Sequence, residues 1–313
     1  MINTTLSNPL NSTKLFLMDR YLNEMVDLHN LKKFPKILLL NGKKGIGKFT
    51  LAIHFLNYIF THQEKNAYNL EDKSINPDSV FYNQLLNQTN QDVLLIKAEE
   101  NKNIKIEEIR NLKSILSRTS LSRKPRFVII DEVEYINESS ANALLKSLEE
   151  PTENNFFILI NNQQSDLIKT ISSRCIMNNI FITSNEADII INHIFKKKKI
   201  EKLIDFDRNL TPGLFVLYNE IYLKNNINKA DNVLDKINKL LFAYKKNKDK
   251  TLINLTLFLI DQYFLLSLQN NQNQLDSLLI IKSSIIKNIN DFIYLNLNIN
   301  SVLNSIEVKL QNV

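Results

Sequence analysis

The chain has 313 residues, of which 44% are hydrophobic and 23% are charged, and its formal net charge is +6. These values are typical of a soluble globular protein, and the length suggests two or three domains. The single cysteine, Cys175, excludes an internal disulfide and any zinc site built from a cysteine cluster. A reducing compartment fits this cysteine usage.

The first residues and the apolar runs indicate a cytoplasmic protein. Residues 1–10 have neither the basic start nor the apolar core of a signal peptide. No apolar run approaches the length of about 18 residues that would suggest a membrane span. We therefore expect a cytoplasmic chain that does not contact a membrane. The positive charge is compatible with contact to a polyanion, although lysine enrichment alone could produce it.

Hydrophobic periodicity predicts the first elements in chain order. Leucine and methionine side chains recur at helical spacing over residues 12–30, which predicts an amphipathic helix. Pro35 ends this pattern, and residues 36–40 predict a short buried strand. The chain has 4 glycines, and three of them lie directly after this strand, at Gly42, Gly45 and Gly47.

The glycines belong to the pattern G-x-x-x-x-G-K, which runs from Gly42 to Lys48 and precedes a helix-like segment at 51–60. A strand, a glycine-rich loop and a helix N-terminus in this order are typical of a P-loop. The loop N–H groups would surround phosphates, and Lys48 would reach the outer phosphate oxygens.

One position departs from the P-loop pattern. The Ser or Thr that should follow the lysine and hold Mg²⁺ is Phe49. Thr50 cannot replace it, because one residue along a helix turns the side chain by about 100°. Thr50 could still touch an inner phosphate. We therefore expect the loop to form, but ATP binding in it to be weak or absent.

Alternating apolar and amphipathic segments predict an α/β fold over the first part of the chain. Further strands are expected at 93–96, 126–130, 156–160 and 177–182, with helices at 104–116 and 139–150. Strands that are apolar throughout are buried on both faces, which is typical of a parallel sheet covered by helices. The alternation predicts a doubly wound sheet.

After Thr183 only helical patterns remain. We therefore predict three domains: an α/β P-loop domain at 1–183, a small helical domain at 184–224 and a helical bundle at 225–313.

Polar residues follow two of the predicted strands. Asp131 and Glu132 come directly after residues 126–130, where P-loop ATPases place a magnesium-binding acid and a carboxylate that polarises the attacking water. Asn161 ends the next strand, where a polar residue can sense the γ-phosphate. The alternative for all three is an ordinary polar strand end.

Arg174 follows two serines and precedes Cys175. Arginine carries a permanent charge on a planar fork that suits phosphate, so at a domain surface it could act as an arginine finger for a neighbour's nucleotide. The alternative is an ordinary surface arginine. The four histidines have no metal-ligand spacing, and we expect no metal site: His29, His54, His62 and His193.

Four segments together resemble the clamp-loader branch of the AAA+ ATPases, and within it the delta-prime subunits of the bacterial DNA polymerase III clamp loader. The segments are Gly42–Lys48, Val128–Glu132, Ala141–Pro151 (ANALLKSLEEP) and Thr170–Cys175 (TISSRC). The last two, joined in this order, are the most specific. The match covers residues 36–182 and weakens after them.

The resemblance implies a RecA-like AAA+ domain, a helical lid and an all-α collar that holds five subunits in a ring. This ring, with its motor and wrench subunits, loads the sliding clamp onto primer–template DNA during replication. Delta-prime subunits are its rigid, largely non-hydrolysing members. Their SRC arginine, here Arg174, acts as an arginine finger in trans and completes the ATP site of the adjacent motor subunit.

Departures from the motor subunits point in the same direction. Besides Phe49, residues 210–215 lack the lid arginine of motor subunits. The cysteine cluster that many clamp-loader subunits carry is missing from 62–90, so no zinc is expected. Two alternatives stay open: an ATP-hydrolysing motor subunit of the same loader, and a stand-alone AAA+ ATPase that binds nucleic acid.

Overall fold

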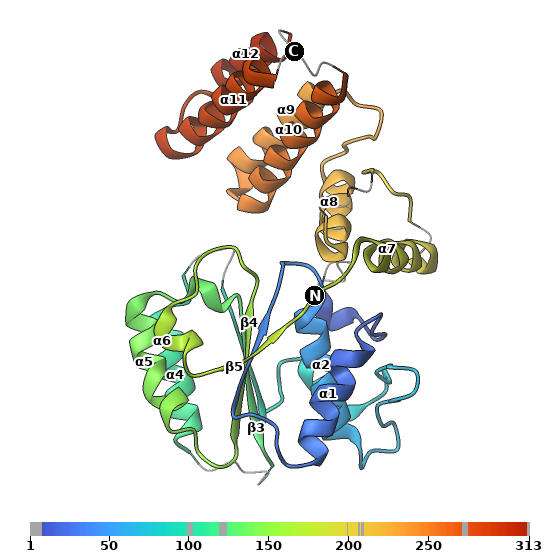
Figure 1. The fold of residues 1–313 in the computed structure, drawn as a ribbon, viewed down its shortest axis with the longest axis vertical. Coiled ribbons are helices and arrows are strands. Elements are labelled where there is room, and N and C mark those ends of the chain that lie inside the picture. Colours follow the sequence, from blue (N-terminus) through green and yellow to red (C-terminus); the bar gives the residue numbers. More distant parts are fainter. Residues whose placement is uncertain are drawn as a thin grey trace. The chain divides into compact units, whose positions relative to one another are not determined.

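The structure is a computed structural model that describes residues 8–98, 103–118, 124–198, 200–205, 207, 210–270 and 275–311 (Figure 1). The chain divides into two compact units, Met1–Leu217 and Tyr218–Val313. The predicted division into three domains, with boundaries after residues 183 and 224, stays a prediction.

The first unit contains a parallel sheet of five strands in the order β2-β3-β4-β1-β5. The strands are β1 (Ile37–Asn41), β2 (Val93–Lys97), β3 (Arg126–Asp131), β4 (Asn155–Asn161) and β5 (Ile176–Asn179). Parallel strands require crossover connections, and helices supply them on both sides of this sheet. The predicted α/β fold with a parallel sheet is confirmed.

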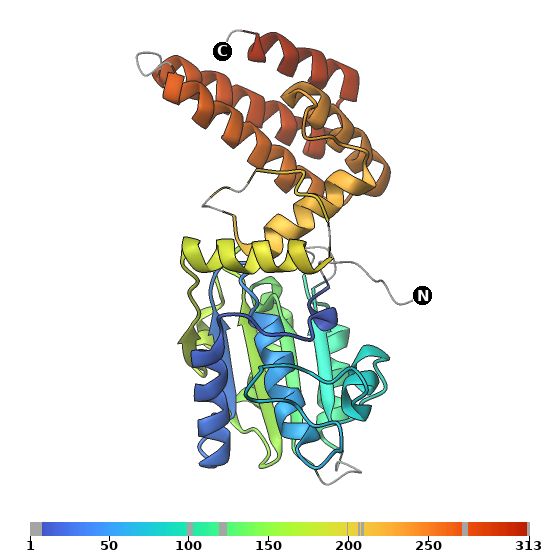
Figure 2. The same cartoon turned by 90° about the vertical axis from the view of Figure 1, so that its right-hand side faces the viewer.

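The helices of this unit cover the two faces of the sheet. In Figure 1, α4, α5 and α6 lie on one side and α1 and α2 on the other, and Figure 2 shows α1 beside α2. Their bounds are α1 (Asp19–Asn30), α2 (Lys48–Thr61), α3 (Val80–Leu86), α4 (Ile106–Leu116), α5 (Glu138–Glu149), α6 (Lys169–Ser172) and α7 (Ser184–Lys198). Two 3₁₀ turns, Pro9–Asn11 and Val133–Tyr135, complete the set, and α8 (Pro212–Lys224) crosses the boundary between the units.

Side chains of the strands β1 to β4 alternate between two buried clusters. In β1, Leu38 and Leu40 pack with the cluster that contains α1 and α2, while Ile37 and Leu39 pack with the cluster that contains α4 and α5. Every residue of β3 is buried. The continuous apolar runs of the sequence therefore arise because both faces of the sheet are covered.

Two predicted elements have different bounds in the structure. The first helix begins at Asp19 rather than at residue 12, because Lys14 pairs with Ser74 in an isolated bridge and Leu17 adopts a left-handed backbone. The last strand is β5, and it leaves the sheet after Asn179 rather than continuing to residue 182. Its extension is bonded differently, since the Phe181 N–H donates to the Tyr21 hydroxyl.

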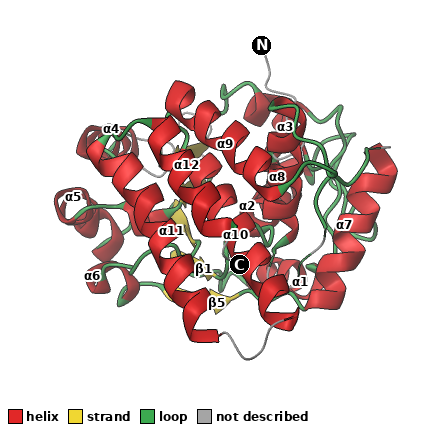
Figure 3. Ribbon diagram, turned by 90° about the horizontal axis from the view of Figure 1, so that it is seen from above, coloured by secondary structure: helices red, strands yellow, loops and turns green. Residues whose placement is uncertain are grey.

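The second unit consists of helices in the part that the structure describes. Besides the end of α8, these are α9 (Val233–Asn247), α10 (Lys250–Asn270), α11 (Leu275–Leu295) and α12 (Ile299–Leu310). Figure 3 shows these four helices from above. Helix α9 packs on α10 and α12, and α11 packs on the same two. The predicted all-helical C-terminal region is confirmed.

Helix α10 contains a stretch that resembles a membrane-spanning helix in length and composition. Residues Lys250–Gln269 are long and apolar enough to cross a membrane by length and composition alone, with a mean hydropathy of 1.5, and 39% of that window is buried. Core helices of soluble bundles have the same properties, and α10 packs on α9 and α11. The expectation that the chain does not contact a membrane stays a prediction.

A buried histidine ties the N-terminal segment and the 62–79 segment to α2. The Nε2 atom of His54 donates to the Ser12 carbonyl at 2.9 Å, and its Nδ1 atom accepts from the Tyr68 hydroxyl at 2.9 Å. Because a carbonyl can only accept, Nε2 carries a proton in this arrangement, and in the neutral ring Nδ1 is then the acceptor. Burial lowers the pKa of His54 to about 4.

We predict that His54 makes the chain less stable in mild acid. Unfolded chains bind a proton at this side chain below its ordinary pKa of 6.5, whereas the folded chain binds it only near pH 4. The free energy of unfolding should therefore fall as the pH drops through this window, by about 3 kcal/mol in total. Urea titrations from pH 7 to pH 4 measure the slope. It should be smaller in His54→Gln and unchanged in His193→Gln, which alters an exposed histidine; equal slopes in both variants would contradict the prediction.

Candidate functional site

The P-loop forms where the sequence predicts it, between β1 and α2. Gly45 and Gly47 have φ values of +83° and +100°, in the left-handed region that favours glycine. A Cβ atom at Gly42 would lie 2.5 Å from the Ile180 carbonyl oxygen, so that position also requires glycine. The predicted shape of the loop therefore depends on all three glycines.

Lys48, the first residue of α2, points back into its own loop. Its Nζ atom donates to the carbonyl oxygens of Gly42 and Lys43, both at 2.7 Å, and only 2% of the residue is exposed. Burial lowers the pKa of Lys48 to about 8, and the negative charges of Asp131 and Glu134 oppose that shift. Two of the three N–H donors of the ammonium group are thus bonded to backbone oxygens of the loop.

The two residues after Lys48 lie in the first turn of α2. The Phe49 ring packs against the apolar cluster that contains α1 and α2. Thr50, half-buried, carries the nearest hydroxyl on this helix. The position that normally holds Mg²⁺ is therefore an apolar packing position, and the chain's residues fit a bound magnesium nucleotide only in part.

The acidic residues at the end of β3 are bonded to lysines and backbone. Glu132 is buried in a left-handed conformation with φ of 60°, and its Oε1 atom lies 2.6 Å from Lys44 Nζ. Asp131 accepts from the Glu132 N–H at 3.0 Å and lies 3.5 Å from Lys97 Nζ. A P-loop lysine and a β2 lysine thus supply positive charge where a metal ion would.

The two asparagines at the carboxyl end of β4, Asn161 and Asn162, have different partners. Asn161 donates from its side chain to Asn41 Oδ1 at 2.9 Å, across the paired ends of β4 and β1. Asn162 Nδ2 donates to Asp131 Oδ1 at 3.3 Å, and its backbone N–H donates to Glu134. Burial raises the pKa of Glu134. The structure therefore brings Asn162, rather than Asn161, onto the acidic residues.

The start of α8 rests directly on the P-loop. Thr211 Oγ1 donates to the Lys44 carbonyl at 2.6 Å, and the Gly213 N–H donates to the Gly45 carbonyl at 2.7 Å. A Cβ atom at Gly213 would lie 2.7 Å from the same Gly45 oxygen, so a glycine is required here as well. One side-chain hydrogen bond and one backbone hydrogen bond thus tie the predicted lid segment to the loop.

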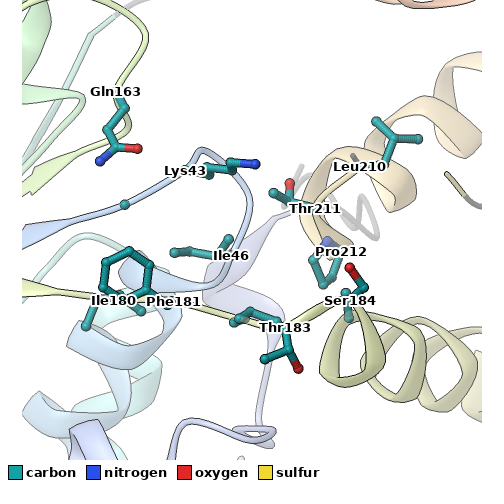
Figure 4. A pocket seen from close by; sticks show the side chains of 13 residues that line it. Lys43, Ile46, Gln163, Ile180, Phe181, Thr183, Ser184, Leu210, Thr211 and Pro212 are labelled. Carbon is teal, nitrogen blue, oxygen red and sulfur yellow. The ribbon is translucent and has the colours of Figure 1, made fainter. Parts of the chain in front are cut away.

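A pocket of about 260 Å³ lies beside the loop (Figure 4). Its wall combines the P-loop, the segment after β5 and the start of α8, with Lys43, Ile46, Gln163 and Thr211 among the residues that line it. Polar and apolar side chains both line this pocket.

Arg174 lies far along the sheet from the P-loop. It follows α6 and precedes β5, whereas the P-loop follows the carboxyl end of β1, the parallel neighbour of β5. The P-loop therefore lies at the carboxyl ends of the strands, and Arg174 lies at their amino ends. The guanidinium of Arg174 forms an ion pair with Glu149, with 2.6 Å between Nη2 and Oε1.

Several residues of this site were not predicted from the sequence. Lys44 and Asn162 contact the predicted residues Glu132 and Asp131, and Glu134 accepts from the Asn162 N–H. The position of Lys44 inside the loop was the only available signal. Among the described residues, no three His, Cys, Asp or Glu side chains gather into a possible metal site. The expectation that the chain binds no zinc stays a prediction.

The family model described as DNA polymerase III, delta subunit, matches residues 18–182, more than half of the chain. A DNA polymerase III subunit delta' of Pseudomonas aeruginosa is 32% identical over 139 residues, 44% of this chain and 40% of the relative. A DNA polymerase III subunit gamma of Buchnera aphidicola subsp. Schizaphis graminum is 29% identical over 218 residues, 64% of this chain and 55% of the relative.

The chain spans about half the length of the curated relatives it matches. Among solved structures, a DNA polymerase III gamma subunit-related protein of Thermotoga maritima aligns with 18% identity and a TM-score of 0.49, over 92% of this chain and 98% of that one. The family match and the relatives agree with the resemblance that the sequence motifs indicate.

We predict that Gly213→Ala loosens the contact between α8 and the P-loop. The added Cβ would lie 2.8 Å from Gly45 Cα as well as close to its carbonyl oxygen, and overpacking of this kind costs about 1–3 kcal/mol. Hydrogen exchange should become faster at the Gly213 and Phe215 amides. Thr211→Ser keeps the hydroxyl that bonds to Lys44 and should behave like the wild type. Unchanged exchange in Gly213→Ala would show that this contact is not tight.

Proposed function

The chain belongs to the family described as DNA polymerase III, delta subunit, and we propose that it serves a clamp loader as a non-motor, stator-like subunit. In this role it helps to load the sliding clamp onto primed DNA during replication, and Arg174 acts as an arginine finger for a neighbouring ATPase subunit. Its chemistry then takes place in the neighbour's site rather than in its own.

The observation that carries the proposal is the bonding of Lys48. In a working P-loop this lysine reaches the outer phosphates. Here its Nζ atom donates to the carbonyl oxygens of Gly42 and Lys43, which occupies two of its three N–H donors. The next residue, Phe49, packs against the apolar core, so Mg²⁺ would lack its usual hydroxyl ligand. Both features favour weak or absent ATP binding.

The position of Arg174 supports a role in trans. It lies at the amino ends of the strands, whereas its own P-loop lies at their carboxyl ends, about the length of one strand away. It also introduces β5, an edge strand whose Ile176 and Met177 side chains are exposed. A surface arginine beside exposed apolar residues is a suitable contact for a neighbouring subunit.

We propose that the partners are motor and wrench subunits in a five-subunit ring. The sliding clamp and primer–template DNA would be reached through this complex, in the cytoplasm. We further propose that segment 62–90 functions without zinc, because the hydrogen bond between His54 and Tyr68 anchors it to α2 instead.

A motor subunit of the same loader is the second candidate. It is favoured by the complete G-x-x-x-x-G-K pattern and by the similarity to a relative named subunit gamma. The two candidates differ in whether the chain hydrolyses ATP by itself.

The isolated chain should hydrolyse ATP far more slowly than the rate on the order of 1 s⁻¹ that a working enzyme reaches. The reason is that Phe49 offers Mg²⁺ no hydroxyl and Lys48 is bonded to its own loop. Steady-state ATPase with primed DNA and clamp measures this, with an intact motor subunit as the positive control. A DNA-stimulated rate on the order of 1 s⁻¹ for the isolated chain would favour the motor-subunit candidate.

Arg174→Ala should lower the DNA- and clamp-stimulated ATPase of the reconstituted complex, and clamp loading should fall further because it needs coordinated sites. Arginine fingers supplied in trans contribute about 10³–10⁵ in rate. With one site of several affected, the loss of total ATPase should be partial. Arg174→Lys should rescue poorly, because an ammonium lacks the planar fork.

The control for this experiment is Arg110→Ala, which removes an exposed arginine from α4. It should leave both ATPase and loading at the wild-type level. If the Arg174→Ala complex assembles and matches the wild type in both assays, Arg174 is an ordinary surface residue.

A further inference from the structure

The Arg174 guanidinium is bonded on both of its edges by its own subunit. Glu149 Oε1 accepts from Nε at 3.1 Å and from Nη2 at 2.6 Å. Nη1 donates to the Thr170 carbonyl at 2.8 Å and to Ser173 Oγ at 3.2 Å. These bonds use four of the five N–H groups that a guanidinium offers.

The partners come from three elements that the fold brings together. Glu149 is the last residue of α5, Thr170 lies in α6, and Arg174 follows α6 directly before β5. The helices α5 and α6 pack on each other. The arginine is therefore held over the α5–α6 junction rather than extended into solvent.

The contact with Glu149 occupies the part of the guanidinium that recognises phosphate. Nε and Nη2 form one side of the planar fork, and that fork binds carboxylate and phosphate oxygens in the same manner. A phosphate that approached this side would meet the Glu149 carboxylate already in place. Two anions cannot share it without repulsion, so one of them has to leave.

We propose that Glu149 is a positioning residue that holds Arg174 against its own subunit and gives it up to the neighbour's phosphate when the subunits close on each other. This inference rests on the proposed role of Arg174 as an arginine finger. Glu149 then acts as a substitute anion that keeps the guanidinium folded back until a stronger anion arrives.

The exposure of the pair makes such an exchange easy. The side chains of Arg174 and Glu149 are 33% and 48% exposed. Exposed ion pairs contribute little to stability because water and salt screen them. Loss of the Glu149 carboxylate should therefore raise kcat/KM of the neighbour's site by about two- to five-fold, and no more.

The test uses the complete reconstituted complex with wild-type chain, Glu149→Gln or the matched control Glu150→Gln. Glu150 is the next residue, is exposed, and carries the same charge. Single-turnover ATP hydrolysis in the presence of clamp and primed DNA measures kcat/KM. We expect a rise for Glu149→Gln, no change for Glu150→Gln, and no effect of Glu149→Gln when Arg174 is already alanine.

A second readout follows the isolated chain. The ¹⁵N-detected Nε–H resonance of Arg174, assigned with Arg174→Lys, should shift and exchange faster with water in Glu149→Gln but not in Glu150→Gln. A general loss of structure would instead move many resonances, so this measurement separates a local release of the arginine from unfolding.

The outcomes distinguish this inference from the proposed function. If Arg174→Ala lowers the rate but Glu149→Gln leaves it unchanged, the arginine finger stands and the exchange is overturned. A lower rate in Glu149→Gln also overturns the exchange, because Glu149 would then stay on Arg174 during hydrolysis. If Arg174→Ala has no effect in an assembled complex, the proposed function fails, and this inference fails with it.

Discussion

The bond between the Lys48 ammonium and its own loop is the interaction on which the site depends. A buried lysine without a partner would be costly, and burial already lowers its pKa to about 8. Two loop carbonyls at 2.7 Å supply the missing partners. The same loop then offers its Lys44 and Gly45 carbonyls to α8. The P-loop has become a bonded part of the scaffold, which helps to hold the start of α8.

The parallel sheet separates the two ends of the proposed chemistry. All five strands run in the same direction. The P-loop, Asp131, Asn161 and Asn162 therefore gather at the carboxyl ends of the strands, and Arg174 lies at the amino ends. Within a single subunit, Arg174 therefore cannot reach the P-loop. When such subunits pack side by side, however, the arginine of one can face the loop of the next. Strand direction is thus consistent with the proposed division of labour between subunits.

Much of the fold was predictable because its signals are local. Apolar strands and the three loop glycines reflect burial and backbone geometry that each segment dictates for itself. The side-chain contacts of the site were not predictable. Lys44 and Glu132 are 88 positions apart, and Asn162 reaches Asp131 only because β4 lies beside β3. The first helix was predicted too long because its apolar pattern continues into residues that instead pair with Ser74.

The charges at the carboxyl end of β3 explain why Phe49 can be tolerated after Lys48. A magnesium nucleotide normally brings the positive metal that Asp131 and Glu132 require. Here Lys97 and Lys44 lie against these two carboxylates, at 3.5 and 2.6 Å. With these lysines in place, the two carboxylates have positively charged partners within the chain, and the ring that follows Lys48 packs against the apolar core. The substitution and the lysine pairs are therefore two parts of one arrangement.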